Sequence, residues 1–161
     1  VLENLCGKPF PETFETAFRA KLYDEFRLGV SPVEGVEQLL SSLKLPYCVA
    51  SSGPREKIEL NLKLTGLEHF FTANKIFSCY EINSWKPEPS IFLHAAAAMG
   101  YAPKDCAVIE DSIAGIQAGI SGGFTVFGLS NGFNDEELAA EGAIVFHYMD
   151  ELPQLLGLDM Q

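Results

Sequence analysis

The hydrophobic positions near the start of the chain follow a helical period. Apolar residues recur every three to four positions, at Phe14, Ala17, Phe18, Leu22 and Phe26. This spacing favours an amphipathic helix over residues 12–28. Gly29 and Pro32 then interrupt the chain, and no strand pattern accompanies the helical one. We therefore expect residues 1–30 to form a helical appendage that ends in a linker.

From residue 31 onward, short apolar runs alternate with helical patterns. The apolar runs predict strands at residues 46–50, 76–78, 107–109, 125–127 and 143–146. Helical patterns stand at 33–43, 54–65, 90–99, 113–120, 135–140 and 151–156, and a long loop is expected from 79 through Lys86. The strand runs are continuously apolar rather than alternating. They predict an α/β fold whose parallel sheet is covered on both faces.

Small polar residues follow the first predicted strand. Ser51, Ser52 and Gly53 come directly after it, and Pro54 stands at the expected start of a helix. Ligands of open α/β sheets bind outside the carboxyl ends of the strands. Hydroxyls and backbone amides at the start of a helix are typical of a phosphate-binding site. The alternative is that Ser51 and Ser52 only cap the helix.

Two acidic residues, Glu110 and Asp111, follow the strand predicted at 107–109. Adjacent carboxylates at the end of a buried strand cost free energy unless something compensates them. A magnesium ion would do so, because it binds carboxylate oxygens while keeping several waters. The alternative is that Asp111 only caps the next helix and Glu110 only forms a salt bridge.

Lys86 lies between these two segments, in a loop where Trp85 precedes it and Pro87 follows it. Such a lysine can place its ammonium against a phosphate or a cluster of carboxylates. The alternative is a loop lysine that faces solvent. Taken together, an anion-binding loop, an ammonium and an acidic pair are complementary parts of a site for phosphoryl transfer.

These segments together resemble a known superfamily. Ala-Ser-Ser-Gly at 50–53, Lys-Pro-Glu-Pro at 86–89 and Val-Ile-Glu-Asp-Ser at 108–112, followed by Gly115 and Gly119, are similar to motifs two, three and four of the haloacid dehalogenase-like (HAD) phosphatases. Within it, residues 31 to about 156 most resemble the branch of β-phosphoglucomutase-like and 6-phosphogluconate phosphatase-like sugar phosphatases. The resemblance implies a Rossmann-like core over 31–161 and the last part of a helical cap over 1–30.

The resemblance also implies roles for individual residues. Ser51 would bind the transferring phosphoryl group with the amides of Ser52 and Gly53, and Lys86 would offset its charge. Asp111 would bind Mg2+ directly, and Glu110 directly or through water. The reaction would pass through an aspartyl-phosphate on a carboxylate nucleophile.

The motif that supplies this nucleophile is absent from the sequence. In the family it is an Asp-x-Asp segment at the end of the first strand, but no two of the aspartates here are separated by a single residue. The resemblance places that strand in the middle of the sheet, between the strands ending at Ser51 and Asp111. We therefore expect this chain to be the C-terminal part of a longer protein and to be inactive alone.

The composition narrows the choice of partners. Acidic residues outnumber basic ones by 22 to 11, so the chain offers no basic surface for nucleic acid or an anionic membrane. Its apolar runs are far shorter than the roughly 20 residues that span a bilayer. Four scattered cysteines, Cys6, Cys48, Cys79 and Cys106, predict reduced thiols and a cytoplasmic location. We expect Cys48 and Cys106 to be buried.

The resulting functional hypothesis is a Mg2+-dependent phosphatase that acts on a small phosphorylated metabolite, a sugar phosphate or sugar-acid phosphate. One alternative is a phosphosugar mutase of the β-phosphoglucomutase type. The other is a truncated, non-catalytic paralogue that keeps the fold for binding. The hypothesis of a non-catalytic paralogue does not explain why four residues typical of a phosphoryl-transfer site occur together: Ser51, Lys86, Glu110 and Asp111.

Overall fold

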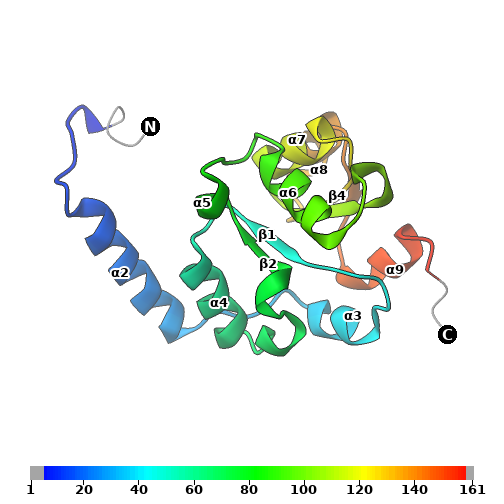
Figure 1. Ribbon diagram of the computed structural model, residues 1–161, viewed down its shortest axis with the longest axis horizontal. Helices are drawn as coiled ribbons and strands as arrows, with labels where there is room; N and C mark the ends of the chain where they lie inside the picture. The colour runs from blue at the N-terminus through cyan, green and yellow to red at the C-terminus, as the bar shows by residue number, and fades with distance from the viewer. Residues whose placement is uncertain (1–5, 159–161) are drawn as a thin grey trace.

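The computed structural model describes residues 6–158, in which short strands alternate with helices (Figure 1). The strands are β1 (Val49–Ser51), β2 (Ile76–Ser78), β3 (Ala107–Glu110), β4 (Thr125–Leu129) and β5 (Ile144–Phe146). The helices are α2 (Phe14–Leu28), α3 (Val36–Ser42), α4 (Arg55–Leu64), α5 (Cys79–Ile82), α6 (Ser90–Met99), α7 (Ile113–Ser121), α8 (Asp135–Ala140) and α9 (Leu152–Leu155). Each predicted element occurs within a few residues of its expected bounds, so the α/β class is confirmed.

Helix α5 replaces the start of the loop that was expected after residue 78, and that prediction was wrong. The Ser78 side chain accepts a hydrogen bond from the backbone of Tyr80, and the Glu81 side chain accepts one from the backbone of Ser78. This is a capping box, and its Ser-x-x-Glu pattern is legible in the sequence. The reciprocal bonds satisfy amides that the first turn of a short helix otherwise leaves unpaired.

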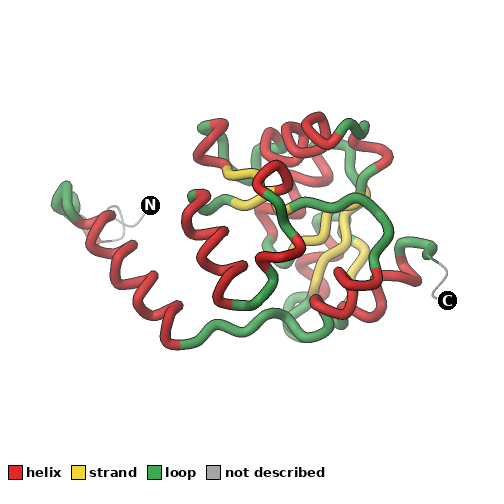
Figure 2. Tube along the Cα trace, turned by 60° about the horizontal axis from the view of Figure 1, so that its bottom comes forward, coloured by secondary structure: helices red, strands yellow, loops and turns green. Residues whose placement is uncertain are grey.

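The strands are all parallel, as predicted, but they form two sheets. One sheet pairs β1 with β2, and the other has the order β3-β4-β5. Within the described residues β1 does not pair with β3, and Figure 2 shows the strands as two separate groups. A cavity of about 490 Å³ lies between them, bordered by Cys48 and Ala50 on one side and by Ala107 and Ile109 on the other.

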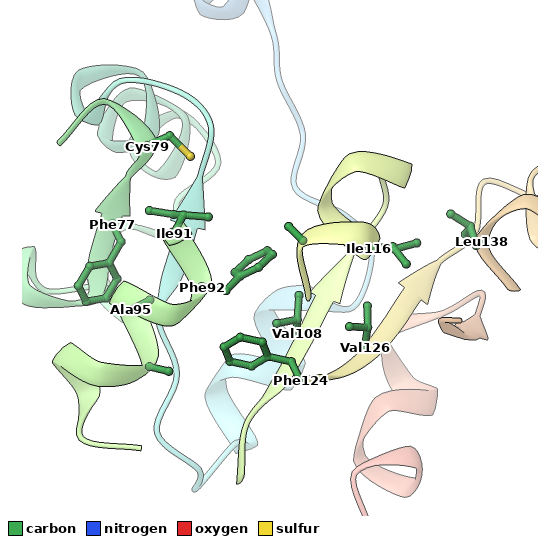
Figure 3. Packing of buried hydrophobic residues seen from close by; sticks show 12 residues of the cluster. Phe77, Cys79, Ile91, Phe92, Ala95, Val108, Ile116, Phe124, Val126 and Leu138 are labelled. Carbon is green, nitrogen blue, oxygen red and sulfur yellow. The ribbon is translucent and has the colours of Figure 1, made fainter. Parts of the chain in front are cut away.

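Helix α6 bridges the two groups of strands through the main hydrophobic core. Figure 3 shows Phe92 of this helix between Phe77 on the β2 side and Val108 and Phe124 on the β3 side. The rings of Phe92 and Phe124 meet edge to face, with their centroids 6.1 Å apart. One continuous core therefore joins strands that share no hydrogen bonds.

A second core covers the opposite face of the β3-β4-β5 sheet. It contains Phe127, Phe146 and Leu152, and α3 packs against it through Val36 and Leu39. Consecutive residues of a strand point to opposite faces, so β4 contributes to both cores. Helices α6 and α7 thus lie on one side of the strands and α3 on the other (Figure 1).

Two burial predictions need correction. Ile109 of β3 remains 41% exposed, so this strand is not covered on both faces as its apolar run suggested. Cys48 and Cys106 are partly rather than fully buried, because both border the cavity between the sheets. Burial still raises the pKa of the Cys48 thiol. All four cysteines are free thiols.

Helix α2 lies at the edge of the molecule, beside α4, and an extended segment joins it to α3 (Figure 1). Its contacts with the body include a hydrogen bond from Arg19 to the hydroxyl of Tyr80, and the Lys57 ammonium lies 5.2 Å from the centre of the Phe26 ring. The assignment of residues 1–30 to the last part of a helical cap stays a prediction, and residues 1–5 lie outside the described part. Among the described residues, none of the helices is long and apolar enough to cross a membrane.

Candidate active site

The loop Ser51–Gly53 begins at the carboxyl end of β1. Ser51 stands opposite Ser78 in the register of β1 and β2. The Gly53 amide donates a hydrogen bond to the Ser51 hydroxyl oxygen over 3.1 Å. The Ser51 hydroxyl accepts this bond and so keeps its own hydrogen for another acceptor.

Neither serine of this loop caps the helix that follows. Pro54 is the N-cap residue of α4, and no side chain accepts a hydrogen bond there. The alternative in which Ser51 and Ser52 serve only as caps was therefore wrong. Pro54 itself precedes the helix rather than opening it, one position earlier than expected.

Lys86 lies between the two sheets and is mostly shielded from solvent. Its ammonium forms an ion pair with Glu110 at the end of β3, and the two side chains are each 10% exposed. The ammonium also donates to the Ala50 carbonyl of β1 over 3.4 Å and lies 4.6 Å from the centre of the Phe92 ring. The alternative of a solvent-facing loop lysine was therefore wrong. Lys86 instead connects the end of β1 to the end of β3.

Glu110 accepts further hydrogen bonds from the residue that caps the next helix. Ser112 donates to its carboxylate through its hydroxyl at 2.9 Å and through its amide at 3.4 Å. The Ser112 side chain is also the N-cap of α7, where it accepts from the Gly115 amide at 3.1 Å. The alternative of Asp111 as a cap was thus wrong. The salt bridge expected for Glu110 is confirmed, with Lys86 as its partner.

Gly115 makes room for the Glu110 carboxylate. A Cβ atom at position 115 would overlap that carboxyl group. Glycine lowers helix propensity, so its presence in the first turn of α7 is explained by this close approach. The ion pair of Glu110 and Lys86 therefore depends on a residue five positions further along the chain.

Asp111 differs sharply from its neighbour. Its side chain is exposed, and within the described residues it has no hydrogen bond or ion pair. The described part of the chain contains no group of three or more His, Cys, Asp and Glu side chains arranged to hold a metal. Mg2+ needs only one or two carboxylates when waters and a substrate phosphate complete its shell, so Asp111 fits part of such a site.

The structure thus gathers the predicted residues at the carboxyl ends of β1 and β3. The Lys86 ammonium contacts both Glu110 and the carbonyl of Ala50, the residue before Ser51. Asp111, next to Glu110, is exposed to solvent. Sequence reasoning missed Ser78, whose hydroxyl donates to the Gly53 carbonyl over 2.7 Å. The Ser-x-x-Glu pattern of a capping box at 78–81 could have marked Ser78 as the start of a helix. It also missed Phe92, which no local pattern marks as a neighbour of Lys86.

Comparisons with known proteins show the family to which this chain belongs. The sequence profile of the haloacid dehalogenase-like hydrolases matches residues 5–123. The chain belongs to the haloacid dehalogenase-like hydrolase family. It is 33% identical over 141 residues to 6-phosphogluconate phosphatase of Escherichia coli K12, covering 88% of this chain and 63% of that protein. It is 30% identical over 130 residues to hexitol phosphatase A of the same organism, covering 77% of this chain and 57% of that protein.

A solved structure shows the same fold as this member of the HAD family. The chain superimposes with a TM-score of 0.82 on a conserved haloacid dehalogenase-like protein of unknown function from Agrobacterium tumefaciens. The two are 28% identical, and the match covers 97% of this chain and 73% of that protein. The chain therefore spans about three fifths of the length of the two curated phosphatases and about three quarters of this structural relative.

Proposed function

We propose that the full-length protein carrying this sequence is a Mg2+-dependent phosphatase of a small sugar phosphate or sugar-acid phosphate. The observation that carries the proposal is the position of Lys86, whose ammonium reaches the end of β1 and the end of β3 at once. The two curated relatives support the substrate class, since they are named for 6-phosphogluconate and hexitol. The net charge of -11 favours a small ligand over a nucleic acid. The free thiols support a cytoplasmic location.

Each residue of the site has a role in this reaction. The Ser51 hydroxyl and the Ser52 amide would donate hydrogen bonds to the oxygens of the phosphoryl group. The Gly53 amide, which donates to the Ser51 hydroxyl oxygen in this structure, would turn to the phosphoryl group when it binds. Lys86 would offset the negative charge that this group carries in the transition state. Its contacts with Ala50 and Glu110 hold the ammonium in place, so little reorganisation is needed when substrate binds.

Asp111 is the residue that would hold Mg2+. Its exposed carboxylate can bind the ion, whereas the Glu110 carboxylate is already engaged by Lys86 and Ser112. When bound, the ion supplies positive charge to the phosphoryl oxygens. Glu110 acts in this proposal by orienting Lys86, and any contact it makes with the ion would pass through water.

The carboxylate nucleophile would come from residues outside this sequence. No two aspartates here have the spacing of the family motif. The cavity of about 490 Å³ lies between the facing edges of β1 and β3, and those edges are unpaired in the described part of the chain. An additional strand in that position would bring its carboxyl end beside Lys86. Residues 31–161 would then form most of a core domain and residues 1–30 part of a cap.

The test is phosphate release by the full-length protein from 6-phosphogluconate, hexitol phosphates and glucose 6-phosphate, with and without Mg2+. We expect release that requires Mg2+ and that falls at least about 100-fold in Lys86→Met. Lys104→Met is the matched control, because Lys104 is exposed in the short 3-10 helix Pro103–Asp105 that precedes β3. No release from any ester with Mg2+ present would overturn the proposal. Conversion of a sugar 1-phosphate into its 6-phosphate would assign a mutase instead.

A further inference from the structure

Ser78 is the one buried polar residue among those described, with no exposed surface. Burying a hydroxyl costs free energy unless its hydrogen-bonding groups find partners. The single hydroxyl hydrogen is donated to the Gly53 carbonyl at 2.7 Å, and the oxygen accepts from the Tyr80 amide at 3.2 Å. The buried serine at the end of β2 therefore depends on the loop that follows β1.

The bond from Ser78 fixes the direction of a peptide group in that loop. A loop that binds an anion must aim its N–H groups at the ligand and its carbonyl groups away from it. Gly53 has no Cβ and so could adopt many backbone conformations. The Ser78 hydroxyl draws the Gly53 carbonyl toward the interior. This carbonyl belongs to the peptide bond with Pro54, which carries no N–H, so the hydrogen bond acts on the loop by holding the backbone of Gly53, whose own amide donates to the Ser51 hydroxyl oxygen.

A second set of contacts ties the helix start that follows the loop to the same strand. Arg55, the first residue of α4, donates to the Ile76 carbonyl of β2 at 2.6 Å and forms an ion pair with Glu81. The Glu81 carboxylate in turn accepts the Ser78 amide at 3.3 Å. The C-terminal side of the loop is thus anchored to β2 twice, through Ser78 at Gly53 and through Arg55 at the start of the helix.

We propose that Ser78 is a positioning residue for the phosphate-binding loop Ser51–Gly53, acting on the ligand only through Gly53. The proposal rests on the proposed function, since it assigns the loop a phosphate ligand. It predicts that loss of the Ser78 hydroxyl weakens phosphate binding more than the accompanying loss of stability explains. It also predicts faster exchange of the backbone amides of the loop.

The experiment compares three variants of the full-length protein. Ser78→Ala removes the hydroxyl, Ser78→Thr keeps it, and Leu138→Val lowers stability in α8 at a fully buried residue of the core. We measure the dissociation constant of inorganic phosphate with Mg2+ present, and the hydrogen exchange of residues 51–57. Ser78→Ala should weaken phosphate binding about tenfold and speed exchange in the loop. Ser78→Thr should restore most of both properties, and Leu138→Val should change neither.

The readouts separate this proposal from the proposed function. If Ser78→Ala and Leu138→Val behave alike at equal loss of thermal stability, Ser78 has only a structural role and the proposal is overturned. If Ser78→Ala does not fold, Glu81→Gln tests the same anchor from the surface and should speed exchange in the loop without unfolding the protein; unchanged exchange counts against the proposal. If the unaltered protein neither binds phosphate nor releases it from any ester, the proposed function fails. The exchange rates then still decide whether Ser78 fixes the loop.

Discussion

Lys86 and Glu110 form an ion pair that joins the two sheets of the core. Glu110 ends β3, while the Lys86 ammonium also reaches the Ala50 carbonyl of β1. Each side chain is only 10% exposed, so water screens this pair weakly. A charge left alone in this position would therefore be costly, and the pair couples the stability of the protein to the geometry of its site.

The first prediction concerns this coupling. Lys86→Met should lower the free energy of unfolding by about 3 kcal/mol, because it removes the only cation among the described residues beside the Glu110 carboxylate and leaves that charge poorly solvated, with Ser112 as its remaining hydrogen-bond donor. Glu110→Gln should cost a similar amount. The double variant should cost clearly less than the sum, with an interaction of about 1–3 kcal/mol measured by urea unfolding of all four proteins. Additive effects would show that the two charges do not depend on one another.

The second prediction concerns the glycines of α7. Gly115→Ala should reduce phosphatase activity strongly while costing less stability than the loss of either charge, because its Cβ displaces the flexible end of Glu110 and so misplaces Lys86 without removing the ion pair. Gly119→Ala is the contrast, since its Cβ would lie 2.6 Å from a methyl group of Val126 in the core. It should cost about 1–3 kcal/mol of stability through overpacking. The activity and the thermal unfolding midpoint of both variants check this prediction. If both variants lost the same activity for each degree by which the midpoint falls, the prediction would be contradicted.

The predictable part of the site follows from strand ends. One apolar run is followed directly by Ser51, and another by the pair Glu110 and Asp111. Parallel strands bring their carboxyl ends to one edge of the sheet. The partner of Lys86 could not be predicted in the same way. Glu110 lies 24 residues further along the chain, and their contact depends on how α6 packs the two groups of strands together.

The same limit applies to Ser78 and to the sheets. The Ser-x-x-Glu pattern at 78–81 predicts a helix start, but the bond from Ser78 to Gly53 spans 25 residues and follows from the register of β1 and β2. An apolar run also does not identify its neighbours. The runs at β1 and β3 therefore predicted strands correctly, but only the resemblance, which places a further strand between them, implied that these two would not pair.

The third prediction is a dependence of stability on acid pH. The hydrogen bond from Arg55 lowers the pKa of the Glu81 carboxyl below its ordinary value. A lowered folded-state pKa means that Glu81 stabilises the protein above its ordinary pKa and loses this contribution as pH falls through the lowered value. The pair is about one third exposed, so the effect should stay below about 1 kcal/mol and shrink in high salt.

Unfolding by urea between pH 7 and pH 3 checks the third prediction. The stability difference between the unaltered protein and Glu81→Gln should be largest near neutral pH and should vanish in acid. Glu59→Gln is the control, because Glu59 lies 3.8 Å from Arg55 and is 52% exposed. Its substitution should have a smaller effect. A difference for Glu81→Gln that stays constant with pH would show that its charge is not involved.

The fourth prediction separates metal binding from folding at Asp111. This carboxylate is exposed and has no hydrogen bond or ion pair within the described residues, so Asp111→Asn should change stability by less than about 0.5 kcal/mol. The same change should raise the Mg2+ concentration needed for half-maximal activity at least about tenfold, since a neutral amide is a weaker ligand for a hard cation. Asp150→Asn is the control, because Asp150 is an exposed aspartate near the C-terminal helix, and it should alter neither quantity.

Removal of Mg2+ by EDTA should abolish the activity of the unaltered protein, and adding Mg2+ back should restore that activity. Full activity of Asp111→Asn at low Mg2+ would remove Asp111 from the proposed metal site.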